Sequence, residues 1–169
     1  MKPVRGYESL RRYRTDLEGV SYFVTVCTRG RKTGLNLPVP GERVVEELHA
    51  MASDRAAFFR SWVIMPDHLH LFVNATGKLS LGQVIGRLKA KTRPALGNCG
   101  LAWQGNFYEH RIRSGDRKEE VLRYLFLNPY QADLIATTER YPYFWLCEDD
   151  QEWFRPTLDD KRPFPEWLV

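Results

Sequence analysis

Long hydrophobic runs are absent from this chain of 169 residues. No apolar stretch approaches the roughly 20 residues that a helix needs to cross a bilayer, so a membrane-spanning segment is not expected. The N-terminus carries basic residues without an apolar segment behind them, so we expect no secretory signal. Cysteine is also scarce. Cys27, Cys99 and Cys147 are widely spaced and odd in number, which predicts reduced thiols in a cytoplasmic protein.

Repeats, low-complexity tracts and internal linkers are absent as well, which favours a single domain over residues 1–169. Within this domain, residues 1–19 form a basic N-terminal segment, and residues 141–169 form an aromatic and acidic C-terminal tail. An apolar fraction of 43% and a charged fraction of 27% are ordinary for a soluble protein, so the bulk composition does not point to a function.

The net charge of +4 is unevenly distributed, because basic residues gather in four clusters with aromatic residues between them. The clusters are Arg5, Arg11, Arg12 and Arg14; Arg29, Arg31 and Lys32; Arg87, Lys89, Lys91 and Arg93; and Arg111, Arg113, Arg117, Lys118 and Arg123. An ordinary solvated surface would explain any one of them. Together they are typical of a protein that binds single-stranded nucleic acid, in which cations meet phosphates and rings stack on bases.

The order of the predicted elements is α+β. Residues that favour β-structure predict strands, and apolar residues at helical spacing predict helices. The strands are expected over 20–28, 58–65, 68–74 and within 103–113, and the helices over 42–57, 80–96 and 113–127. Ser80 and Ser114 are the candidate N-caps of the last two helices. This order predicts an antiparallel sheet with helices packed on one face, close to the split β-α-β plan of ferredoxin-like folds.

Two of the four histidines stand in the triplet His68-Leu69-His70, inside an apolar run that predicts a strand. Residues i and i+2 of a strand point to the same face, so the two imidazoles would project side by side from a rigid sheet, as a metal ion requires. The alternative is a polar strand face on which each histidine is satisfied by a neighbour or by water. The triplet alone does not decide between the two.

A second group of polar residues lies on the predicted helix that begins near residue 113. Tyr124 and Asn128 are four residues apart and share one face if the helix reaches Asn128. Pro129 marks the end of that helix or a kink, because it lacks an N–H donor and restrains the residue before it. A hydroxyl and an amide would thus be presented together to the histidine pair. Without the histidine pair, the same residues would predict a core tyrosine followed by the end of a helix.

Three segments, taken in order, resemble the single-tyrosine HUH transposases, and within them the REP-associated tyrosine transposases. Residues 65–71 are similar to the family's histidine strand with its preceding turn, residues 103–113 to its central aromatic and basic segment, and residues 124–135 to its tyrosine helix. Three ordered segments are more specific than a lone pair of histidines. Asp133 departs from the pattern, since the family more often has a basic residue and a glycine in this turn.

The resemblance implies an HUH endonuclease fold and a reaction on single-stranded DNA. Tyr124 would attack a backbone phosphate and leave a 5′-phosphotyrosine link and a free 3′-hydroxyl. A second strand's 3′-hydroxyl would then reverse the step, so that strands are joined without ATP. His68, His70 and Asn128 would hold a divalent ion, and the oxygen donor favours Mg²⁺ or Mn²⁺ over zinc. Less favoured third ligands are Gln131, Asp67, Glu109 and His110.

The expected partner is single-stranded or hairpin DNA, and the expected protein is a bacterial, cytoplasmic and nucleoid-associated monomer or homodimer. The predicted DNA contacts are Arg11, Arg12, Arg14, Arg87, Lys89, Lys91, Arg93, Arg111 and Arg113. Two other functions stay open. One is a domesticated relative that binds hairpins without cutting them. The other is a metal-dependent phosphoester hydrolase that uses His68 and His70, although no aspartate-rich ligand set stands beside these histidines.

Overall fold

The computed structural model describes residues 19–113, 116–154, 158–159 and 162–163. Three of the predicted DNA contacts, Arg11, Arg12 and Arg14, lie outside the described residues, as does the proposed helix cap Ser114. Among the described helices, none combines the length and the apolar composition that a membrane span requires.

Strands and helices follow one another in an order close to the predicted one. In chain order they are β1 (Ser21–Cys27), η1 (Arg29–Arg31), α2 (Pro38–Ser53), β2 (Phe58–Ile64), β3 (His68–Asn74), α3 (Leu81–Asn98), β4 (Tyr108–Ile112), α4 (Lys118–Gln131), β5 (Phe144–Leu146), α5 (Glu148–Phe154), β6 (Leu158–Asp159) and β7 (Arg162–Pro163).

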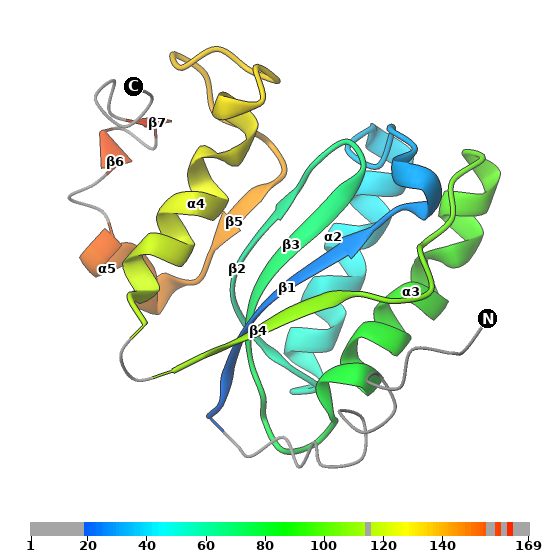
Figure 1. Ribbon diagram of the computed structural model, residues 1–169, viewed down its shortest axis with the longest axis horizontal. Helices are drawn as coiled ribbons and strands as arrows, with labels where there is room; N and C mark the ends of the chain where they lie inside the picture. Colours follow the sequence, from blue (N-terminus) through cyan, green and yellow to red (C-terminus); the bar gives the residue numbers. More distant parts are fainter. Residues whose placement is uncertain (1–18, 114–115, 155–157, 160–161, 164–169) are drawn as a thin grey trace, which may run out of the picture.

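A five-stranded sheet in the order β4-β1-β3-β2-β5 forms the centre of the molecule, and its neighbouring strands pair antiparallel (Figure 1). Its first four strands alternate with α2 and α3 in the order β-α-β-β-α-β, which is the ferredoxin-like plan. The predicted α+β fold is therefore confirmed. The fifth strand comes from the C-terminal tail, where Trp145 stacks on Trp62 of β2 with ring centroids 6.1 Å apart.

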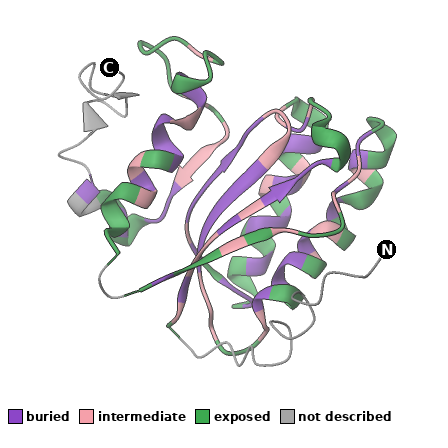
Figure 2. Cartoon of the chain, viewed as in Figure 1, coloured by how far each residue is buried: buried purple, intermediate pink, exposed green. Residues whose placement is uncertain are grey.

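The two faces of the sheet bury separate apolar clusters, because side chains alternate along each strand. Val24, Leu69 and Leu71 belong to the cluster under α2 and α3, whereas Val63 and Phe72 belong to the cluster under α4. Figure 2 shows the buried residues along the central strands and on the inward sides of the helices. The prediction of helices on one face holds for α2 and α3, but α4 lies against the opposite face. An apolar stripe on a helix fits either face of such a sheet, so the sequence did not specify the face.

Charged side chains also tie α2 to α3. Glu47 is only 3% exposed and accepts hydrogen bonds from Arg87 Nε at 2.9 Å and from an Arg43 guanidinium nitrogen at 3.3 Å. Arg87 reaches Asp54 as well, at 2.8 Å. The two arginines neutralise a carboxylate that could not be buried alone, so this ion-pair network joins the two helices.

The tyrosine helix α4 begins later than predicted, at Lys118, and the residue before it, Arg117, is the N-cap. It runs to Gln131 with Pro129 inside its last turn, so Asn128 belongs to the helix. Asp133 follows with a φ of 52°, a left-handed conformation that glycine adopts most easily and aspartate tolerates. This geometry explains why a glycine would suit the turn after this helix.

Ser80 caps α3, as predicted. Ser80 Oγ accepts a hydrogen bond from the backbone N–H of Gln83 at 3.3 Å, and Gln83 Oε1 accepts one from the backbone N–H of Ser80 at 2.9 Å. This reciprocal pair satisfies two donors that the first turn would otherwise leave without partners.

Replacing this cap tests its contribution to stability. Ser80→Ala should lower the free energy of unfolding by about 1 kcal/mol, because the Gln83 N–H loses its acceptor. Ser80→Asp keeps an acceptor at the same place and should stay within about 0.5 kcal/mol of the unmodified protein. Urea denaturation followed by circular dichroism measures both. Equal losses in the two variants would show that the cap contributes nothing.

Candidate metal and tyrosine site

The imidazoles of His68 and His70 lie on the face of β3 that carries the α4 cluster. Their Nε2 atoms are 3.0 Å apart, and the rings meet edge to face with centroids 4.4 Å apart. Two ligands of one divalent ion, each about 2.1 Å from it and at right angles, lie about 3 Å from one another. The spacing of the two nitrogens therefore fits a shared ion, and the two imidazoles do share one strand face.

The other ring nitrogen of each histidine is bound to a neighbouring side chain. His68 Nδ1 lies 2.6 Å from Asp67 Oδ1, and His70 Nδ1 lies 2.8 Å from Thr25 Oγ1 on β1. Arg31 binds the second oxygen of Asp67 through Nε at 2.8 Å. When each Nδ1–H donates outward in this way, both Nε2 atoms keep a free lone pair, as metal ligands require.

Burial keeps both imidazoles neutral at neutral pH. Together with the charges of His68 and Arg31, it lowers the pKa of His70 to about 3. Burial also lowers the pKa of His68, although the Asp67 carboxylate partly opposes it. A neutral imidazole is the form that binds a metal ion, so the electrostatics of the site agree with its geometry.

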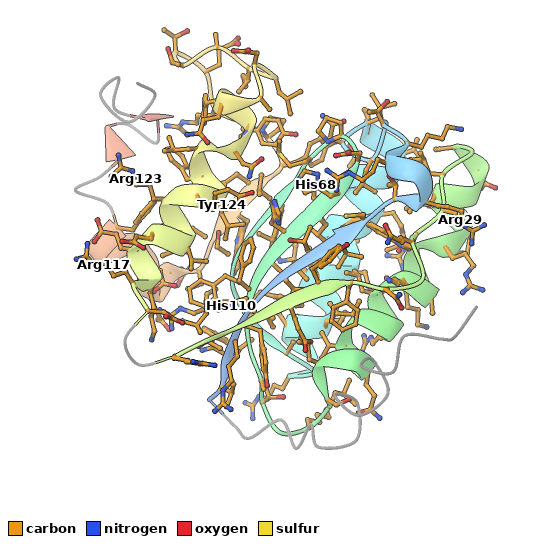
Figure 3. The ribbon with its side chains drawn as sticks, in the orientation of Figure 1. Arg29, His68, His110, Arg117, Arg123 and Tyr124 are labelled. Carbon is orange, nitrogen blue, oxygen red and sulfur yellow. The ribbon has the colours of Figure 1, made fainter. Side chains whose placement is uncertain are left out.

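Tyr124 brings its hydroxyl to the histidine pair from α4 (Figure 3). Tyr124 Oη lies 3.4 Å from His70 Nε2, yet the residue is 46% exposed. Phe23 of β1 contacts both rings, since it stacks on His70 with centroids 5.1 Å apart and meets Tyr124 edge to face at 5.8 Å. The hydroxyl therefore lies beside an imidazole nitrogen of the histidine pair, on a side chain that is partly open to solvent.

Asn128 lies one turn after Tyr124 on the same helix and is half-buried. The shared helical face that the sequence predicted is therefore present. Among the described residues, no group of three or more His, Cys, Asp and Glu side chains could hold a metal ion. The donor set that fits a hard divalent ion here is two neutral imidazoles with an oxygen ligand, and the amide of Asn128 remains the candidate for it. Asp67, an alternative ligand, is already bound to His68 and Arg31.

Sequence reasoning did not identify Phe23, Thr25 or Arg31 as parts of this site. The alternation of the first predicted strand places Phe23 and Thr25 on one face, which was the only available signal. The pairing of Thr25 with His70 depends on the register between β1 and β3, and that register is a tertiary property. Arg31 reaches Asp67 from η1 with a φ of 56°, a conformation that its residue type does not suggest.

Of the four predicted DNA contacts on α3, two are engaged in hydrogen bonds within the protein and two are exposed. Arg87 belongs to the ion-pair network with α2, and its hydrogen bonds to Asp54 and Glu47 raise its pKa. Lys89 donates to three backbone carbonyls in the loop 104–106, at 2.7, 3.2 and 3.1 Å, and burial lowers its pKa. Lys91 and Arg93 are exposed. The free charge of this helix is thus concentrated near its C-terminal half.

Arg29, Lys89 and Arg93 line a groove of about 460 Å³ beside Trp103. Figure 3 shows Arg29 and Tyr124 on opposite sides of His68. Arg111 stands opposite Tyr22 in the pairing of β1 with β4, which places it on the sheet face away from Tyr124. The predicted contacts therefore do not form one patch. Their role in binding DNA stays a prediction.

A second groove, of about 550 Å³, begins at Tyr124 and runs between β4 and the first turns of α4. Its lining residues are Phe23, His110, Ile112, Asp116, Arg117, Glu120, Val121 and Tyr124. In Figure 3 His110 lies on β4 below Tyr124, and Arg117 lies near the start of α4. This groove could not be predicted from the sequence, because its walls come from separate elements.

A histidine pair on an inner strand of a ferredoxin-like sheet, with a helical tyrosine beside it, is the arrangement of an HUH tyrosine transposase. Residues 16–124 match the family described as "Transposase IS200 like", and the chain belongs to this family. The chain is 26% identical over 136 residues to the REP-associated tyrosine transposase of Escherichia coli (strain K12). The matched stretch covers 79% of this chain and 80% of that protein. A solved REP-associated tyrosine transposase bound to a REP hairpin has a similar fold, with a TM-score of 0.64 and 22% identity over 85% of this chain and 82% of that chain.

The hydrogen bond from His68 to Asp67 predicts the effect of a substitution on metal binding. Asp67→Ala should weaken Mn²⁺ binding by about 10- to 100-fold, because His68 loses the partner that orients its ring. Isothermal titration calorimetry with MnCl₂ measures the affinity directly, without any activity. Asp149→Ala, on the exposed side of α5, serves as the control and should leave the affinity unchanged. Equal affinities in the two variants would mean that Asp67 has no part in ligand orientation.

Proposed function

We propose that this protein cuts and rejoins single-stranded DNA at repeat hairpins, with Tyr124 as the nucleophile and a divalent ion as the cofactor. Membership in a transposase family supports this function. The two relatives above add to it, since one is a REP-associated tyrosine transposase and the other was solved bound to a REP hairpin. The observation that carries the proposal is the 3.4 Å separation between Tyr124 Oη and His70 Nε2 at a place open to solvent.

In the proposed step, Tyr124 Oη forms a bond to the phosphorus of a backbone phosphodiester, and the bond from phosphorus to the 3′ oxygen breaks. The phenol loses its proton as the new bond forms, and the departing 3′ oxygen gains one. The products are a 5′-phosphotyrosine and a 3′-hydroxyl. One phosphodiester replaces another, so a 3′-hydroxyl from a second strand can reverse the step and join strands without ATP.

His68, His70 and Asn128 would hold the divalent ion. A bound Mg²⁺ or Mn²⁺ would supply Lewis-acid stabilisation of the charge that gathers on the phosphate oxygens. The protein contributes rigid orientation. Asp67 and Thr25 hold the two imidazoles through their outer nitrogens, and the contact of Phe23 with the Tyr124 ring places the hydroxyl beside them.

Two other tyrosines provide comparisons with Tyr124. Tyr130, also on α4, is 5% exposed, donates its hydroxyl to the Glu139 carbonyl at 2.9 Å, and has its pKa raised by burial. These features suit a structural residue rather than a nucleophile. Tyr108 on β4 is 64% exposed and stands opposite Thr25, on the same sheet face as the histidines. Its exposure makes it a matched control for Tyr124.

The first test of the proposed chemistry uses a labelled single-stranded hairpin with MnCl₂, followed by a denaturing gel. The unmodified protein should form a covalent complex with the DNA, and Tyr124→Phe should form none because it lacks the attacking oxygen. Binding of the hairpin, measured by fluorescence anisotropy, should be the same for both proteins. EDTA should also abolish the covalent complex.

The control variant Tyr108→Phe should form as much covalent complex as the unmodified protein. A complex formed by Tyr124→Phe would refute the assignment of the nucleophile. Hairpin binding without a covalent product from any variant, whichever divalent ion is supplied, would favour a binding-only protein. Hydrolysis that survives Tyr124→Phe would favour a phosphoester hydrolase.

The exposed cations on the far side of the histidine pair are the proposed contacts for the DNA backbone. Arg29 and Arg93 line the same groove. Among the described residues, no carboxylate lines this groove. A strand that places a phosphate at Tyr124 would extend past His68 toward this groove, given the positions in Figure 3. Arg87, in contrast, serves mainly to join α3 to α2.

Comparing two arginines of α3 separates these roles. Arg93→Ala should lower the slope of log K against log salt concentration for single-stranded DNA by about 0.7, because one phosphate contact is lost. Arg87→Ala should leave that slope unchanged and should instead lower the free energy of unfolding by about 2 kcal/mol, because the buried Glu47 loses a charged partner. Anisotropy titrations at several salt concentrations and urea denaturation measure the two effects. A lower salt slope in Arg87→Ala together with an unchanged slope in Arg93→Ala would contradict this assignment of roles.

A further inference from the structure

The groove between β4 and the start of α4 has no assigned role, although Tyr124 forms one of its walls. We infer that this groove binds one unpaired nucleobase of the strand that is cut, and that it selects a base with an exocyclic amino group. The inference rests on the proposed function, since the DNA strand places the base there. It adds a site of sequence preference next to the scissile phosphate.

The wall of the groove is apolar. Phe23 of β1 and Ile112 of β4 come from the sheet, and Val121 comes from α4. Phe23 is held in place by its stack on His70, so its ring is a fixed part of the wall. A volume of about 550 Å³ lies within the range of about 300–1,000 Å³ that small-molecule sites occupy. Aromatic and aliphatic side chains of this kind are the surfaces on which unpaired bases pack.

The rim of the groove is polar, and one of its two carboxylates, Asp116, is held by a hydrogen bond. Asp116 Oδ2 accepts a hydrogen bond from the backbone N–H of Arg113 at 2.7 Å and lies 3.5 Å from His110 Nε2. Glu120 lies 3.5 Å from an Arg117 guanidinium nitrogen, and both side chains are largely exposed. Two carboxylates and a guanidinium thus surround an apolar slot.

This charge pattern selects among the bases. Carboxylate oxygens only accept hydrogen bonds, and cytosine, adenine and guanine each present an amino group that donates. Thymine presents a carbonyl at the position where cytosine has its amino group, so a carboxylate would repel it. A groove for phosphates alone would carry cations and exclude carboxylates, whereas Asp116 and Glu120 both line this one.

The groove is continuous with the tyrosine site. Tyr124 borders both, and Val121 lies about one helical turn before it on α4. Cytosine and thymine have the same ring size and differ in the group at C4 and in the C5 methyl group of thymine. The change in this preference when a rim carboxylate is removed therefore separates the hydrogen bond from the packing of the ring and methyl group.

The experiment measures binding without cleavage. Fluorescein-labelled (dC)₈ and (dT)₈ are titrated with the protein in EDTA, and anisotropy gives the two Kd values. The unmodified protein should bind (dC)₈ about tenfold more tightly than (dT)₈. Glu120→Ala should bring the two affinities together, because the amino group loses its acceptor. Glu119→Ala, on the neighbouring helix position outside the groove, should keep the preference.

A second variant fills the groove. Val121→Trp should weaken binding of both octamers, whereas Leu134→Trp, at an exposed position after α4, should not. Circular dichroism and a thermal melt verify that the two tryptophan variants fold. If Glu120→Ala keeps the preference for (dC)₈, or if a folded Val121→Trp binds both octamers normally, the base site is refuted.

The covalent-complex assay separates this inference from the proposed function. If the unmodified protein forms no complex with the hairpin, the proposed chemistry fails, while the octamer titrations still decide whether the groove binds a base. If the complex forms but the octamer preference does not respond to Glu120→Ala, the chemistry stands and the base site fails.

Discussion

The register of β3 within the sheet is the constraint on which the site depends. Alternation along this strand directs His68 and His70 to one face while Leu69 and Leu71 fill the core on the other. A slip of one residue would exchange these sets, placing imidazoles in the apolar cluster and leucines on the face that carries the proposed metal site. β3 is paired on both sides, by β1 and β2, so a slip would break two ladders of hydrogen bonds at once.

The second half of the site depends on the other apolar cluster. Leu122, Leu125 and Phe126 of α4 are buried with Phe72 of the sheet, and this packing fixes the helix relative to β3. Tyr124, between these residues in the sequence, is then left at the edge of the cluster. The site lies at a boundary between interior and solvent. Burial suits the proposed metal ligands because it makes them rigid, whereas the proposed nucleophile needs access to a DNA strand, and the boundary provides both.

Much of the fold could be predicted because its signals are local. The strands around residues 21–27, 58–64 and 68–74 are runs of β-branched and aromatic residues ended by turns, and they were placed to within about two residues. The start of α4 and the three-residue strand β5 were not predicted. Arg117 is an unusual cap without a side-chain hydrogen bond, and the short strand has too few residues to show a period. Its position depends on the stacking of Trp145 on Trp62, a contact between distant segments.

The sequence by itself determined which residues share a strand or a helix, and therefore that His68 and His70 face one way and that Tyr124 and Asn128 lie on one helical turn. Those relations follow from backbone periods of two and 3.6 residues, which are local properties. Only the tertiary structure decided that α4 lies on the histidine face, that Thr25 and Asp67 orient the rings, and that a groove opens beside the tyrosine. These depend on strand register and on packing between segments far apart in the chain, because the free energy that selects them comes from contacts that no local pattern encodes.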